Sequence, residues 1–147
     1  MKKFLVLMVF LLMPVLVFGL NASISPTQIK KNAKGVFAID IVATENIVAQ
    51  EIAISIPDGF SPPDPLSNKA GWFSISGAKI KGYSIINQTI TINGITLKSG
   101  ETMTVLYGSK IKKGKGALSP NVNKIVNFII LYHGDTLNLP VVVGGGN

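Results

Sequence analysis

The sequence predicts an all-β protein in which about eight or nine short strands form two sheets packed as a sandwich. Polar and apolar residues alternate in several segments, most clearly over residues 89–93, where Ile90 and Ile92 share one face. Gly, Pro and Asn turn signals separate these segments, and no helical period follows residue 22. The 147 residues are enough for one domain, and the absence of cysteine excludes disulfides and thiol redox chemistry.

The N-terminus is typical of a secretory signal peptide. Met1–Lys3 is positively charged, residues 4–18 are apolar apart from Pro14, and small residues follow at Gly19 and Ala22. We therefore expect a signal-peptide helix over residues 1–22, cleaved after Gly19 or Ala22, and a β-sandwich domain over residues 23–147. A permanent membrane helix is the alternative. The predicted location is extracellular or in the cell envelope, with membrane contact only before cleavage.

Each strand is predicted from its own pattern. In chain order we expect strands over residues 24–29, 36–42, 52–56, 72–76, 79–85, 89–93, 102–107, 125–132 and 136–143. Pro26 and Pro140 place the first and last strands at sheet edges, since proline donates no hydrogen bond to a ladder. Over residues 36–42, Phe37, Ile39 and Ile41 share one face.

The connections carry equally local signals. Three prolines in residues 60–65 predict a stiff loop between the sheets. Asn93-Gly94 and residues 98–101 predict turns. Alternating lysines over residues 79–81 are typical of an edge strand. The nearly continuous apolar run over residues 125–132 predicts a central strand covered on both faces.

Charge narrows the classes of partner. All 14 basic residues are lysine, and without Lys2 and Lys3 the remaining 12 lysines and 7 acidic residues give a net charge of +5. A basic balance favours anionic partners, whereas the lack of arginine argues against specific nucleic-acid recognition. One lysine-rich loop is predicted either as a solvated connection or as a contact for an anionic polymer, and its lysines are Lys110, Lys112, Lys113 and Lys115.

Few residues suit catalysis or metal binding. His133 is followed by Gly134-Asp135 and is predicted to be a turn residue, and Asp58 and Asp64 lack the spacing of a calcium loop. We therefore predict no enzyme activity and no cofactor. Trp72, Phe60 and Tyr83 are the candidates for stacking on a glycan, with packing in the core as the competing interpretation.

Two segments resemble a known pattern. Residues 52–63 form an alternating strand ended by Pro57-Asp-Gly59-Phe60-Ser-Pro-Pro, and residues 88–108 read QTITINGITLKSGETMTVLYG. Together they resemble immunoglobulin-like modules of bacterial and archaeal surface-layer and adhesin-type proteins, over about residues 25–108. The resemblance implies an immunoglobulin-like sandwich without catalytic residues, and it implies that the matched positions determine the fold: Pro57, Gly59, Phe60, Gly100, Tyr107 and Gly108.

The expected function is a non-enzymatic secreted or cell-surface module with a structural or adhesive role. Its expected partners are cell-envelope proteins or polysaccharide. A carbohydrate-binding module for cell-wall or extracellular polysaccharide is the alternative. The last strand, residues 137–143, is apolar and terminal, so it suggests either an ordinary strand of the sandwich or an edge for assembly with further copies.

Overall fold

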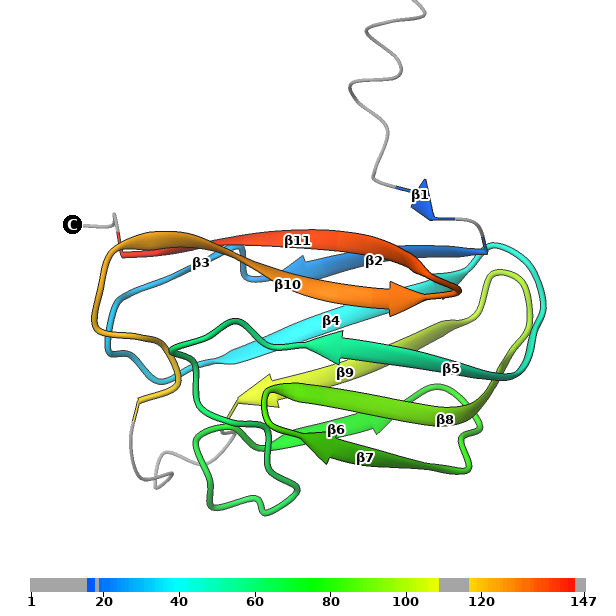
Figure 1. The fold of residues 1–147 in the computed structure, drawn as a ribbon, viewed down its shortest axis with the longest axis horizontal. Helices are drawn as coiled ribbons and strands as arrows, with labels where there is room; N and C mark the ends of the chain where they lie inside the picture. Colours follow the sequence, from blue (N-terminus) through cyan, green and yellow to red (C-terminus); the bar gives the residue numbers. More distant parts are fainter. Residues whose placement is uncertain (1–15, 18, 109–116, 145–147) are drawn as a thin grey trace, which may run out of the picture.

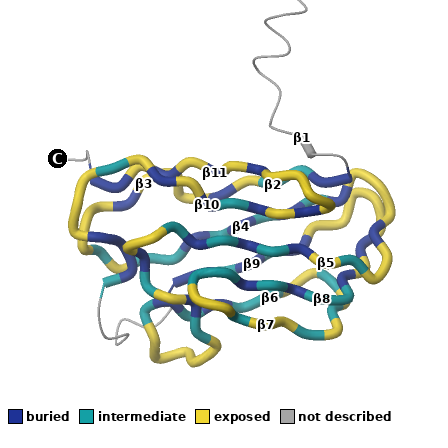
Figure 2. The backbone as a smooth tube through the Cα atoms, in the orientation of Figure 1, coloured by how far each residue is buried: buried dark blue, intermediate teal, exposed yellow. Residues whose placement is uncertain are grey.

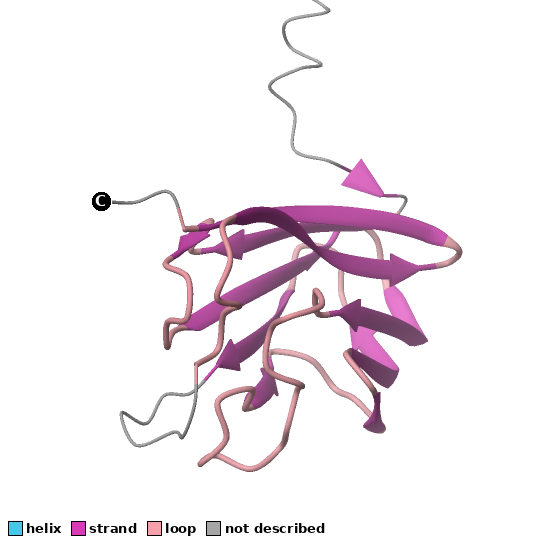
Figure 3. Cartoon of the chain, turned by 60° about the vertical axis from the view of Figure 1, so that its left-hand side comes forward, coloured by secondary structure: helices cyan, strands magenta, loops and turns pink. Residues whose placement is uncertain are grey.

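The computed structural model describes residues 16–17, 19–108 and 117–144, and the chain in these ranges consists of strands and connections (Figures 1 and 3). One sheet has five strands in the order β1 (Leu16–Val17), β2 (Leu20–Ser25), β4 (Val36–Ala43), β9 (Thr102–Gly108), β6 (Phe73–Ser76). The other has six in the order β3 (Gln28–Ile29), β11 (Asp135–Val143), β10 (Lys124–Tyr132), β5 (Ile47–Ser55), β8 (Thr89–Leu97), β7 (Gly82–Ile86). The prediction of an all-β chain with two packed sheets is confirmed.

The predicted signal-peptide helix cannot be compared with the structure, because residues 1–15 and 18 lie outside the described residues. Within the described ranges, no helix has the length and apolar character needed to cross a membrane. The first long strand, β2, begins at Leu20, whose side chain is fully buried.

A single hydrophobic core lies between the two sheets and is built by alternation along the strands (Figure 2). On β4, Phe37, Ile39 and Ile41 are fully buried, as predicted, while the residues between them are half-buried. The ring of Phe128 on β10 lies 5.1 Å from that of Phe37 and 5.3 Å from that of Phe60. These contacts join the two sheets through aromatic packing.

The segment predicted as one strand over residues 24–29 is divided between the sheets. β2 pairs antiparallel with β4, and after Pro26 the chain crosses so that β3 pairs parallel with the end of β11. The prediction of one continuous strand was therefore wrong. Proline interrupts the ladder at this point, and the two halves pair in different sheets.

Asn93-Gly94 is not a turn, which corrects a second prediction. β8 continues through both residues, and Gly94 has a φ of 65° inside a bulge, where Ile92 pairs with Ile52 but Ile95 pairs with Gln50. The extra residue shifts the alternation by one position. Without that shift, the residues after the bulge would face outward; with it, Ile95 and Leu97 join Ile90 and Ile92 in the core.

β5 has a matching irregularity and is longer than the predicted 52–56. It starts at Ile47, directly after the predicted connection at residues 45–46, and Ala49 takes a φ of 51° where the register with β8 shifts again. Ile47 lies at an odd position and Ile52 and Ile54 at even positions, yet all three are buried. The bulge near Ala49 makes this possible.

β10 is central in its sheet, as predicted, but it is covered on one face only. Val126, Phe128, Ile130 and Tyr132 are buried, whereas Ile125 is 72% exposed and Leu131 is 40% exposed. The prediction of coverage on both faces was therefore wrong. Its outward residues are as apolar as its inward ones, so the sequence pattern alone does not distinguish the faces.

The edges of the six-stranded sheet agree with the sequence in part. β7 lies at one edge, as the alternating lysines before it predict. β11 is covered on its outer side by β3 only at Val142 and Val143. Pro140 lies in the part of β11 that has β10 as its only ladder partner, a position where its missing N–H disrupts no ladder.

Candidate functional site

The structure places the three predicted glycan-stacking residues in different surroundings. Phe60 is 3% exposed and packs edge-on against Phe37 and Phe128, so its ring cannot face a sugar, and this residue is removed from the predicted set. Tyr83 on β7 is 45% exposed, but the edge-to-face contact with Phe73 occupies part of its ring. Trp72, just before β6, is half-buried.

His133 and Asp64 make contacts within the connections of the fold. His133 lies in the β10–β11 turn with a φ of 50°, as predicted, stacks on Tyr132, and places Nε2 2.8 Å from the Gln50 side-chain oxygen. Asp64 accepts a 2.9 Å hydrogen bond from the Leu66 N–H. In the described part of the chain, no three His, Asp or Glu side chains gather as a metal site would require.

Two buried tyrosines have perturbed acidity. Burial raises the pKa of Tyr107 far above its ordinary value, and its hydroxyl donates a hydrogen bond to the Ser61 carbonyl in the loop that joins the sheets. Burial and the nearby Glu45 carboxylate raise the pKa of Tyr132. Both changes favour the neutral phenol, which stabilises structure and supplies no base near neutral pH.

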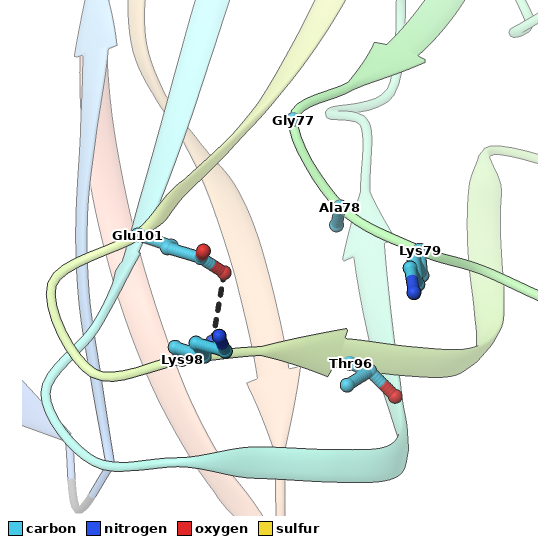
Figure 4. A pocket seen from close by; sticks show the side chains of 6 residues that line it. All are labelled: Gly77, Ala78, Lys79, Thr96, Lys98 and Glu101. Carbon is cyan, nitrogen blue, oxygen red and sulfur yellow. Dashed lines mark hydrogen bonds between the residues drawn. The ribbon is translucent and has the colours of Figure 1, made fainter.

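A hollow of about 490 Å³ lies between the end of β8 and the segment after β6 (Figure 4). It is lined by Gly77, Ala78, Lys79, Thr96, Lys98 and Glu101. The Glu101 carboxylate accepts a 2.8 Å hydrogen bond from the Lys98 N–H, which closes the turn predicted over residues 98–101. Its one carboxylate is therefore engaged in holding the turn.

The predicted contact lysines of residues 110–115 lie outside the described residues. The lysines that are described lie in connections, apart from Lys124 at the first position of β10. Consequently the outward faces of the strands are nearly free of positive charge, although the chain as a whole carries +7.

The outer face of the six-stranded sheet carries few charged residues. Cross-strand pairing places two rows on this face, each running from β7 to β11. The first row is Ile86, Thr89, Ser55, Ile129, Asn138, and the second is Ser84, Thr91, Ala53, Leu131, Thr136. Both rows consist of neutral residues and thus offer contact by shape and apolar area.

An apolar stripe crosses this face along β10 and β11. Its members alternate with buried residues along the two strands and therefore face outward, with Asn127 and Asn138 between them: Ile125, Ile129, Leu131, Pro140 and Val142. Ile125 pairs with Val142, and these side chains are 72% and 38% exposed. We refer to these five residues as the β10 stripe.

The outer face of the five-stranded sheet differs from it. Its outward positions mix small polar residues, such as Ser23, Ser74 and Thr104, with half-buried apolar ones, such as Leu106, and Asp40 accepts a 2.7 Å hydrogen bond from the Thr104 hydroxyl. Large side chains exposed on strands occur instead on the six-stranded sheet and its margins. The β10 stripe is therefore the better candidate for a binding surface.

Sequence reasoning missed this surface. Residues 125–132 were interpreted as buried on both sides, which hid the outward-facing members Ile125, Ile129 and Leu131. The sequence does contain a usable signal, because no lysine interrupts residues 125–143. Lysine at outward positions commonly protects exposed strands, and the outward positions of β10 and β11 have none.

Comparison with known proteins identifies no family for this chain. No protein-family profile matches the sequence, and no curated protein is significantly similar to it. Among solved structures, one similar chain is described as "AvmM Catalyzes Macrocyclization in Alchivemycin A Biosynthesis", at 10% identity and a TM-score of 0.43 over 88% of this chain and 90% of that one. A similarity this distant carries no inference about activity.

Proposed function

We propose that the protein is an exported, non-enzymatic module of the cell surface or cell envelope with a structural or adhesive role. The observation that carries this proposal is the outer face of the six-stranded sheet, which is largely uncharged and bears the apolar β10 stripe. Exposed apolar side chains gathered on one face mark an interaction site more often than a catalytic one. The signal-peptide pattern at residues 1–22 supports export.

We further propose an immunoglobulin-like arrangement of the strands. In its support, the order β2-β4-β9-β6 follows the A-B-E-D sheet of that fold, and β11-β10-β5 follows the G-F-C sheet. The hairpin of β7 and β8 extends the second sheet and lies between β6 and β9 in sequence. This order is also the support for a resemblance to surface-layer and adhesin-type modules.

The carbohydrate-binding alternative has weaker support. Of its three aromatic residues, Phe60 is in the core and Tyr83 is engaged with Phe73, which leaves half-buried Trp72 as the main candidate. This alternative predicts that wall polysaccharide changes Trp72 fluorescence and that Trp72→Ala abolishes retention while the fold is kept. Tyr83→Phe is the matched control, since it keeps an aromatic ring in place.

The proposed function is tested by locating the native protein in cells that produce it. Fractionation should recover it in the envelope or the medium, and a membrane-impermeant amine reagent added to intact cells should label its lysines. Recovery in the cytoplasm, or protection from the reagent until the cells are broken, would contradict the proposal.

A further inference from the structure

We propose that the protein pairs with a second copy of itself through the outer face of the six-stranded sheet. The two β10 stripes pack together, and the end of the face near the β10–β11 turn of each copy lies against the opposite end of the other copy. This inference names a partner for the proposed surface module and therefore rests on the proposed function. It differs from assembly through the edge of the last strand, because the contact uses side chains on a face.

The apolar content of the face is the first argument. Ile125 is 72% exposed, Leu131 40% and Val142 38%. The first two lie on β10 and the third on its neighbour β11. Side chains on an open sheet face project toward any sheet that packs on it, at a layer spacing of about 10 Å. Pairing would remove the β10 stripe from water in the same way that the inward residues of β10 are already covered.

The size of the face is the second argument. Five strands at about 4.8 Å spacing and seven residues at about 3.3 Å rise cover about 24 Å by 23 Å, or about 1,100 Å² for two copies together. A specific interface needs about that much buried surface. A pair of these faces thus reaches the size of a weak to moderate dimer, whereas the β10 stripe alone would not.

Charge is the third argument, and it favours a second copy. The chain carries a net +7, or +5 without Lys2 and Lys3, so the approach of two copies is least opposed at a surface with few lysines. Glu51 lies at the end of this face near the β10–β11 turn, and Lys30 lies at the opposite end, directly after β3. Packing with the ends opposed brings the acidic end of each copy to the lysine end of the other.

The same features disfavour other partners. An anionic polymer would find no lysine among the two neutral rows, and a sugar would find no aromatic ring on the β10 stripe. A face that contacts its own copy about a two-fold axis needs only to be complementary to itself. Neutral residues of similar size along β10 and β11 meet that requirement.

The test is sedimentation of the native protein, as recovered from producing cells, over a range of concentrations. We expect the mass to rise from one chain to two. Ile125→Lys and Leu131→Lys should each weaken association at least tenfold, since two-fold symmetry buries every added charge twice. Leu66→Lys adds the same charge at a loop residue that is 57% exposed, and it should change association less than twofold.

The orientation has its own test. Glu51→Lys should weaken pairing severalfold, and the double variant with Lys30→Glu should restore it, because each copy then offers exchanged charges. A wild-type chain that stays monomeric at about 100 µM, where a micromolar dimer would form, overturns the inference. The inference is also overturned if Leu66→Lys weakens association as much as Ile125→Lys and Leu131→Lys do. If Lys30→Glu does not restore pairing of the Glu51→Lys protein, the proposed orientation of the two copies is overturned. Envelope recovery of a monomer would overturn pairing and leave the proposed function standing.

Discussion

Replacing Tyr107 with phenylalanine should destabilise the protein at neutral pH and flatten its loss of stability in alkali. The ring is fully buried, and its hydroxyl donates a hydrogen bond to the Ser61 carbonyl. Tyr107→Phe keeps the ring packing but leaves that carbonyl without its donor. The expected loss in the free energy of unfolding is about 1–3 kcal/mol at pH 8.

The pH dependence gives the second half of the prediction. Burial raises the pKa of Tyr107 above the ordinary tyrosine value of about 10. Above pH 10 the unfolded chain therefore releases this proton while the folded chain keeps it, and stability falls by about 1.4 kcal/mol per pH unit. Phenylalanine has no proton to release, so the gap between the two proteins should shrink by about 1.4 kcal/mol at pH 11.

The assay is urea unfolding between pH 8 and pH 11, followed by the fluorescence of the single tryptophan, Trp72. Tyr132, whose pKa is also raised, contributes the same slope to both proteins and cancels in the comparison. Tyr83→Phe, at a residue 45% exposed, is the control and should change stability by less than about 0.5 kcal/mol at pH 8. Unchanged stability of Tyr107→Phe at pH 8, or a gap that stays constant to pH 11, would refute the reasoning.

Three further outcomes are expected. Phe128→Ala should lower the free energy of unfolding by about 3–5 kcal/mol in urea, because it empties the centre of the aromatic cluster, and a loss below about 1 kcal/mol would contradict that role. Gly108→Ala should prevent folding as judged by circular dichroism. The φ of Gly108 is 123°, and an added Cβ would clash with the Gly35 carbonyl oxygen. A stable variant would show that the backbone can move there. If the signal peptide is cleaved, N-terminal sequencing should begin at Leu20, which is fully buried, and a start after Ala22 would argue against a structural need for this half of β2.

Most strands could be predicted from the sequence because their signals are local. Alternation over β4 identified Phe37, Ile39 and Ile41 as core residues, and residues 98–101 were identified as a turn. The failures occurred where pairing partners decide the outcome. Asn93-Gly94 satisfies a turn and a bulge equally well, and only the partner strand β5, with its own bulge, makes the second choice the stable one.

The candidate site was less accessible to sequence reasoning. Packing in the core was the competing interpretation for Trp72, Phe60 and Tyr83, and of these three the structure places only Phe60 in the core. The β10 stripe could not be seen, because an apolar strand can be covered on both faces or exposed on one. That distinction depends on what lies above the sheet, and the sequence of β10 does not contain it.

The bulges and the neutral face are two consequences of the same arrangement. By shifting the alternation, the bulges let Ile47, Ile95 and Leu97 face inward beside their neighbours. The core therefore extends to the end of the sheet where β5 begins and β8 ends. The outward positions between the bulges and the opposite end then hold only neutral residues, while lysines remain in the connections. Repulsion between copies therefore acts at the ends and edges, and the β10 stripe is left as the surface where two positively charged chains can meet.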